Sequence, residues 1–209
     1  MYLFTRQVLL NPAHVRAGTS QALEMTRYVN EKTKLQVSLF QVLAGAPFGT
    51  LTFAFRTESY AASTSESDSL LQSDEYMEKV ESGADLFVGN PQDQIGQIIH
   101  ETGTIVGPPA AASIVSATLD VSQAAAAVAW AIELADFTSK LTGVPGAVIS
   151  SNFGQYGTIS WLAYGSSLAQ LEEASEQTNS DSGFLERLGK SGGLFVPGSG
   201  TSVLSRKIS

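Results

Sequence analysis

The chain has 209 residues, 43% of them hydrophobic and 15% charged, a balance that suits a packed core and excludes an intrinsically disordered protein. Acidic residues outnumber basic ones by 20 to 12, and the net charge of −8 opposes a phosphate backbone, so no nucleic-acid partner is predicted. The absence of cysteine excludes disulfides and Cys-ligated metal centres. No basic-then-apolar leader and no apolar run long enough to span a bilayer is present, which predicts a cytoplasmic protein without membrane contact.

Hydrophobic periodicity predicts the elements of the first half of the chain. They are a strand at 2–10, a helix at 13–32, strands at 35–39 and 51–55, a weak helix at 60–71, a helix through residue 80, and a strand at 93–101. Ser73 is the expected N-cap of the third helix. In the first strand, alternation places Phe4, Arg6 and Val8 on one face, with the intervening residues on the other. The predicted order is β-α-β-β-α-α-β.

The second half repeats that order with smaller strand residues. The pattern predicts a strand at 109–118, a helix that Asp120 caps and that runs through residue 140, a hairpin at 143–151 and 156–165, a short helix opening at 166, a helix at 180–190, and a closing strand at 201–208.

The two halves align with each other at a nearly constant displacement of 108 residues. Residues 49–53 match residues 157–161, and residues 86–88 match residues 194–196. Chemical class is kept while identity drifts, which indicates two copies of one packing unit, a first repeat at 1–103 and a second at 109–209. Each copy is too small to cover its own sheet, so the two are predicted to pack face to face.

Three phrases of the second half carry a resemblance to a known group of proteins. They are the run SLAQLEEA at 167–174, the helix start formed by Ser180-Asp181 with Phe184-Leu185, and the run LFVPG at 194–198. With the element order, they resemble the dimeric α+β barrel superfamily, close to its antibiotic-biosynthesis-monooxygenase and NIPSNAP-like branches. The resemblance implies the α+β class, with two ferredoxin-like repeats forming a pseudo-dimeric barrel within one chain. Members of the superfamily include cofactor-independent oxygenases, haem proteins and proteins with no known activity, so the fold carries over and the function does not.

Four residues are the candidates for binding a small molecule: Arg56, Asn152, Trp161 and Tyr164. In the resembling proteins, cleft-facing side chains of the third strand often line the pocket, and the displacement pairs Arg56 with Tyr164 on the two third strands. A cofactor-free oxygenase needs an aromatic pocket, a polar group that receives a proton, and a cation or amide that holds the developing anion. These four residues could fill those roles. Alternatively, the strand aromatics pack beneath the helices as ordinary core residues.

The two histidines are the only residues that could serve as a haem ligand, and neither stands where the resemblance would place one. His14 begins the first helix and His100 ends a strand, whereas the haem-degrading relatives carry their ligand in the third helix, and residues 73–88 contain no histidine. No haem, metal or other cofactor is predicted.

Two functions of different classes remain. The first is a small-molecule-binding barrel with cofactor-independent, monooxygenase-like chemistry on an aromatic metabolite, which predicts a buried pocket containing Arg56 or Tyr164. The second is a non-catalytic structural or interaction protein, whose barrel is filled by its own aromatic side chains. Such a protein could assemble as a homo-oligomer.

The strand residues of the second half are smaller than their counterparts in the first. Gly143, Pro145 and Ala147 stand where the first half has leucine and valine, so volume is missing between the second sheet and its helices. That volume is expected either to hold a ligand near Trp161 and Tyr164 or to be filled by the two tryptophans.

Overall fold

The computed structural model describes residues 1–105 and 109–209. The elements of its first half are β1 (Tyr2–Leu10), α1 (Val15–Lys32), β2 (Ser38–Ala44), β3 (Thr50–Thr57), α2 (Tyr60–Leu71), α3 (Asp74–Ser82), the short helix η1 (Ala84–Leu86) and β4 (Phe87–Thr102). Ser73 caps α3 as predicted, because its hydroxyl accepts a hydrogen bond from the Tyr76 backbone N–H.

The second half has the same order of main elements. They are β5 (Ala111–Thr118), the short helix η2 (Val121–Gln123), α4 (Ala124–Thr142), β6 (Gly146–Phe153), β7 (Thr158–Gly165), α5 (Leu168–Ser180), α6 (Ser182–Gly189) and β8 (Thr201–Lys207). Asp120 caps η2, the turn that precedes α4, by accepting from the Ser122 N–H.

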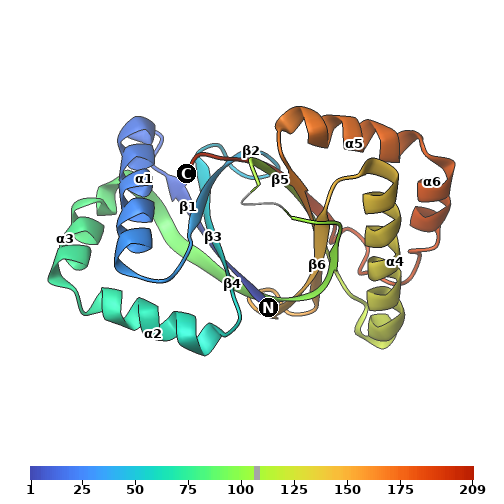
Figure 1. The fold of residues 1–209 in the computed structure, drawn as a ribbon, viewed down its shortest axis with the longest axis horizontal. Coiled ribbons are helices and arrows are strands. Elements are labelled where there is room, and N and C mark those ends of the chain that lie inside the picture. The colour runs from blue at the N-terminus through green and yellow to red at the C-terminus, as the bar shows by residue number, and fades with distance from the viewer. Residues whose placement is uncertain (106–108) are drawn as a thin grey trace.

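Within the described residues the eight strands close into one antiparallel barrel in the order β1-β3-β2-β8-β5-β7-β6-β4. Each half contributes four strands in the same order, and the halves join at two equivalent seams, β2 with β8 and β4 with β6. Helices α1 to α3 lie against one side of the barrel and α4 to α6 against the other (Figure 1). The predicted fold, two ferredoxin-like repeats forming an α+β barrel within one chain, is confirmed.

The predicted boundary between the repeats includes residues 106–108, which lie outside the described residues. The division into 1–103 and 109–209 therefore stays a prediction.

Two strands differ in extent from the sequence prediction, for identifiable reasons. The second strand begins at Ser38 rather than at Leu35, because the side chain of Asn30 bonds both the N–H and the carbonyl of Val37, at 2.7 and 2.9 Å. β4 begins at Phe87, before the predicted Asp93. The early part of β4 includes Pro91, which has no backbone N–H to donate. A strand tolerates proline where one edge is unpaired, and β4 pairs with β6 from Ile95 onward, so the β6 edge of β4 is free at Pro91.

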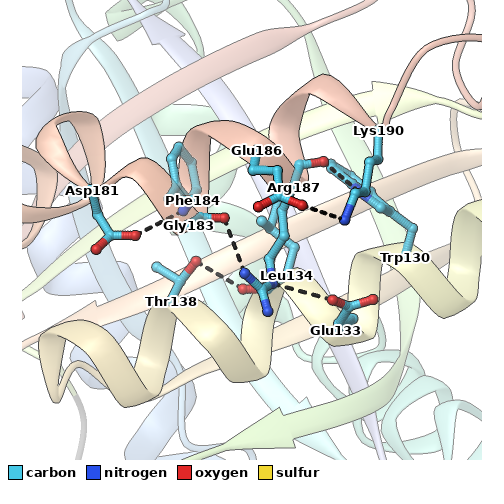
Figure 2. A network of polar contacts seen from close by, with 10 residues as sticks. All are labelled: Trp130, Glu133, Leu134, Thr138, Asp181, Gly183, Phe184, Glu186, Arg187 and Lys190. Atoms are coloured by element: carbon cyan, nitrogen blue, oxygen red, sulfur yellow. Dashed lines mark hydrogen bonds and ion pairs between the residues drawn. The ribbon is translucent and has the colours of Figure 1, made fainter.

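In the second half, α6 packs onto α4 through an arginine and a tryptophan (Figure 2). Arg187 donates to the Glu133 carboxylate at 3.1 Å and to the Gly183 carbonyl at 3.0 Å. Its guanidinium carbon also lies 4.0 Å from the centroid of the Phe137 ring. In return, Trp130 Nε1 donates to the Arg187 carbonyl at 2.9 Å. These contacts fix the two helices above the second sheet.

Replacing Arg187 with methionine is expected to lower the free energy of unfolding by about 1 to 2 kcal/mol, because methionine keeps an unbranched stem but loses the cation over Phe137. Urea denaturation followed by far-UV circular dichroism measures the change. Lys190→Met is the matched control, since the ion pair of Lys190 with Glu186 is exposed to solvent and its loss should barely move the midpoint. Equal midpoints for the two variants would contradict the prediction.

Candidate functional site

Two cavities stand out, one on each face of the first-half strands. The barrel lumen, enclosed by strands of both halves, has a volume of about 650 Å³. The sheet–helix cavity, between β1, β3 and β4 and the helices α1 to α3, has a volume of about 400 Å³. Both volumes lie in the range of small-molecule pockets.

The lumen is lined by the side chains that alternation turns away from the helices. Most of its polar groups are hydroxyls and amides: Thr5, Gln7, Gln36, Ser38, Thr52, Gln94, Ser116, Ser151, Gln155, Thr158, Ser160, Thr201 and Ser205. Its apolar residues include Leu3, Phe40 and Leu162, and the only described lining residues that titrate are Arg56 and Tyr164.

The structure brings Arg56 and Tyr164 together at this lumen. They occupy corresponding places on β3 and β7, where Arg56 pairs in register with Leu3 and Tyr164 pairs with Ala112. Arg56 forms an ion pair with Glu101 of β4. Tyr164 is 8% exposed, and its hydroxyl has no hydrogen-bond partner among the described residues.

The electrostatics of this end of the lumen keep the Tyr164 hydroxyl protonated. Burial raises the pKa of Tyr164 to about 12, because the phenolate would lose its hydration. Arg56 acts on this pKa in the opposite direction and Glu101 acts in the same direction as burial, so both charges lie near the phenol. At neutral pH Tyr164 is a hydrogen-bond donor, which suits an oxygen acceptor on a ligand.

The sheet–helix cavity has aromatic walls. Phe4, Phe53, Phe55 and Phe87 line it from the strands, and the rings of Phe4 and Phe55 stack with centroids 4.8 Å apart. The helices add Met25 and other aliphatic residues, together with the polar residues Gln21, Thr26, Ser67, Tyr76 and Lys79. Such walls suit a flat aromatic molecule, because ring faces gain both buried area and stacking.

Two cations line this cavity, Arg6 on the strand wall and Lys79 on α3, where Lys79 is paired with Glu24. Alternation places Arg6 on the helix-facing side of β1 between Phe4 and Val8, and its guanidinium forms two hydrogen bonds of 2.7 Å with the Asp93 carboxylate. Hydrogen bonding to Asp93 raises the pKa of Arg6, burial opposes this, and Tyr76 raises it further, which places that phenol near the guanidinium. The sequence indicated which face of the strand Arg6 occupies. It gave no indication that Asp93, 87 residues away, is the partner of Arg6.

The displacement between the repeats explains why this space is open in the first half. Trp130 of α4 corresponds to Ala22 of α1, and Trp161 corresponds to Phe53. In the second half, the rings of Trp130, Trp161 and Phe195 pack against one another at centroid distances of 5.5 to 5.7 Å. In the first half the corresponding Ala22 and Phe53 line a cavity instead. Of the two outcomes that the sequence left open for the second half, the tryptophans fill the space.

The other two sequence candidates lie away from both cavities. Trp161 is on the helix-facing side of β7, and its Nε1 donates to the Ala131 carbonyl at 3.0 Å. Asn152 is exposed near the end of β6, where its side-chain oxygen accepts from the Gln97 N–H at 3.0 Å. Neither lines the lumen or the sheet–helix cavity.

The histidines are engaged separately. His14 is the N-cap residue of α1, and His100 bonds to Asp136 of α4 at 2.7 Å. Among residues 1–105 and 109–209, no group of three His, Asp or Glu side chains comes together in a way that could hold a metal ion. No helix in the same ranges is long and apolar enough to cross a membrane.

Comparison with known proteins gives likeness at the level of structure. No protein-family model matches the sequence, and no curated protein matches it significantly. A candidate monooxygenase from Fusobacterium nucleatum superposes with a TM-score of 0.73 at 6% identity, over 100% of this chain and 92% of that one. An anthrone oxidase-like protein gives 0.68 at 10% identity, over 100% and 91%. A candidate monooxygenase from Lactobacillus acidophilus gives 0.64 at 9% identity, over 100% and 94%.

At these identities the likeness concerns the fold. The chain has the α+β barrel fold of these structures, with both halves of the barrel supplied by one polypeptide.

Proposed function

We propose that the protein binds an aromatic, phenol-like small molecule in the sheet–helix cavity and supports its cofactor-independent, monooxygenase-like oxidation there. The observation that carries the proposal is a 400 Å³ cavity with four phenylalanines in its wall and one guanidinium, that of Arg6, among them. Two of the fold neighbours are candidate monooxygenases and a third is anthrone oxidase-like, which agrees with this chemistry.

Anthrone shows what the site would have to do. Its methylene carbon lies between two aromatic rings, so loss of a proton to water gives a delocalised anion whose charge rests largely on the carbonyl oxygen. Arg6, held in place by Asp93, would stabilise that oxyanion, and Tyr76 would donate a second hydrogen bond to it. The anion transfers electrons to O₂. The methylene becomes a carbonyl, one oxygen atom enters the product, and the other leaves as water.

The alternative, a non-catalytic barrel, predicted a lumen that its own aromatic side chains fill. The aromatic residues among the described lumen lining are Phe40, Phe55 and Tyr164, and about 650 Å³ stays open beside them. The open space favours the small-molecule hypothesis.

With anthrone as the probe, the chelator-treated protein is expected to consume O₂ faster than buffer alone. Arg6→Met is expected to lower kcat by about a hundredfold, because a single oxyanion donor contributes on that scale. An oxygen electrode measures the consumption of O₂, and the absorbance of anthraquinone measures the formation of product. Arg206→Met is the control, since Arg206 bonds Gln41 on the exposed surface and lines neither cavity.

A second variant tests the location. Ala22→Trp copies the residue that fills the second half, and it should abolish anthrone turnover while the protein stays folded. If Arg6→Met and Ala22→Trp oxidise anthrone at the wild-type rate, the reaction does not occur in the sheet–helix cavity. If the wild-type protein does not exceed the buffer rate, the oxygenase proposal fails.

A further inference from the structure

The barrel lumen is a separate compartment from the sheet–helix cavity, on the opposite face of β1 and β3. Thr5 and Gln7 line the lumen, whereas Arg6 and Val8 line the other cavity. We propose that the lumen is a second binding site, for a neutral molecule with an apolar body and a hydrogen-bond-accepting oxygen, which it binds with that oxygen on the hydroxyl of Tyr164. This site does not depend on the oxidation proposed above.

The first argument is the unpaired hydroxyls. A buried hydroxyl without a partner is unfavourable, and native proteins rarely keep one unless something else satisfies it. Of the described residues, Tyr164 is one whose buried hydroxyl lacks a partner, and Thr158 is another. Both lie on β7 and both line the lumen. They are six residues apart on the same face of the strand, roughly 20 Å along its length. The wall of the lumen therefore holds a buried hydroxyl without a partner among the described residues toward each of its ends.

The second argument is charge. No aspartate, glutamate, lysine or histidine is found among the described residues that line the lumen. Its one cation, Arg56, is already paired with Glu101. A charged ligand would lose its hydration without gaining a free counter-charge, so a neutral ligand is favoured.

The third argument is the distribution of apolar side chains. Phe40, Ala112, Ile149, Leu162 and Tyr164 belong to one buried cluster in the wall, with Leu3 packed against it. Hydroxyls and amides lie beyond the cluster, among them Gln7, Ser116 and Thr158. This pattern fits a molecule whose apolar body lies against the cluster, with an oxygen atom near the Tyr164 hydroxyl.

Prodan, a neutral naphthalene that carries one carbonyl group, is a suitable probe, because its fluorescence emission shifts when that carbonyl accepts a hydrogen bond. The titration uses the Ala22→Trp protein, in which the sheet–helix cavity is filled. We expect one equivalent of prodan to bind. Adding Tyr164→Phe, which removes the hydroxyl and changes no wall volume, should weaken binding by about tenfold and shift the emission to the blue.

Tyr76→Phe in the same background is the matched control, because it removes a phenol hydroxyl from the filled cavity and should leave both readings unchanged. Ala54→Phe adds a ring inside the lumen and should block prodan entirely. The proposal is overturned if Ala22→Trp alone abolishes binding, or if Tyr164→Phe leaves affinity and emission as they were. Because Tyr164→Phe is nearly isosteric, its result decides the matter even if Ala54→Phe does not fold.

Discussion

Replacing Trp161 with alanine is expected to lower the free energy of unfolding by about 3 to 4 kcal/mol, the range for truncating a large aromatic side chain in a core. The indole packs against Trp130 and Phe195, each at a centroid distance of 5.7 Å, and its N–H bonds the Ala131 carbonyl. Alanine would leave a cavity between the sheet and α4 that the second half has no other side chain to fill. Urea denaturation monitored by far-UV circular dichroism measures the loss.

Trp161→Phe is the matched control and also tests the sequence hypothesis that placed this residue at a ligand site. Phenylalanine keeps one ring in the cluster, so the expected loss of stability is only about 1 kcal/mol. Affinity for anthrone and for prodan should not change in this variant, because the indole lines neither cavity. If Trp161→Phe has near-wild-type stability but binds either probe clearly more weakly, the prediction is wrong and Trp161 belongs to a binding site.

The architecture could be predicted from the sequence because several independent patterns agreed. Alternation identified the strands, and the displacement of 108 residues joined the two halves into one design. The same reasoning placed Arg56 and Tyr164 at corresponding positions, and alternation turned Arg56 away from its neighbouring phenylalanines. The structure shows both on the lumen face of their strands.

The position of the open space could not be predicted in the same way. The sequence argument compared strand residues, such as Leu35 with Gly143, and inferred missing volume in the second half. A layer between a sheet and helices is filled from both sides, and the decisive difference is on the helix, where α1 has Ala22 at the position that Trp130 occupies in α4. Which helix residue faces the sheet depends on how the helix is rotated, and periodicity fixes this only to within a broad face.

The polar groups of the sheet–helix cavity illustrate the same limit. Alternation put Arg6 on the same face of β1 as Phe4 and Val8, and the structure shows that this face lies under the helices, where an arginine is unusual. The ion pair with Asp93 offsets the cost of burying the Arg6 guanidinium. Asp93 is on β4, which lies beside β1 only in the folded barrel. Pairing over such a separation leaves no trace in a single sequence.

Tyr164→Phe is expected to remove a part of the alkaline instability of the protein. The pKa of the Tyr164 phenol is about 12 in the folded protein, against 10.0 for an ordinary tyrosine. Between these values the unfolded chain releases the proton while the folded chain keeps it, so stability is fully present below pH 10 and falls as the pH rises toward 12. Two pKa units correspond to about 3 kcal/mol in total, of which about half is lost by pH 11.

Phenylalanine has no proton to lose, so the advantage of Tyr164→Phe over the wild type should grow with pH. At pH 8 the two proteins should be close in stability, with any difference favouring phenylalanine, because the hydroxyl it removes has no partner among the described residues. Urea denaturation at pH 8, 10 and 11 follows the change. Tyr156→Phe is the control, since Tyr156 is 82% exposed and its replacement should reproduce the wild-type pH dependence. Parallel curves for Tyr164→Phe and the wild type would mean that the folded protein solvates the Tyr164 phenolate, and the lumen would then be accessible to water at that end.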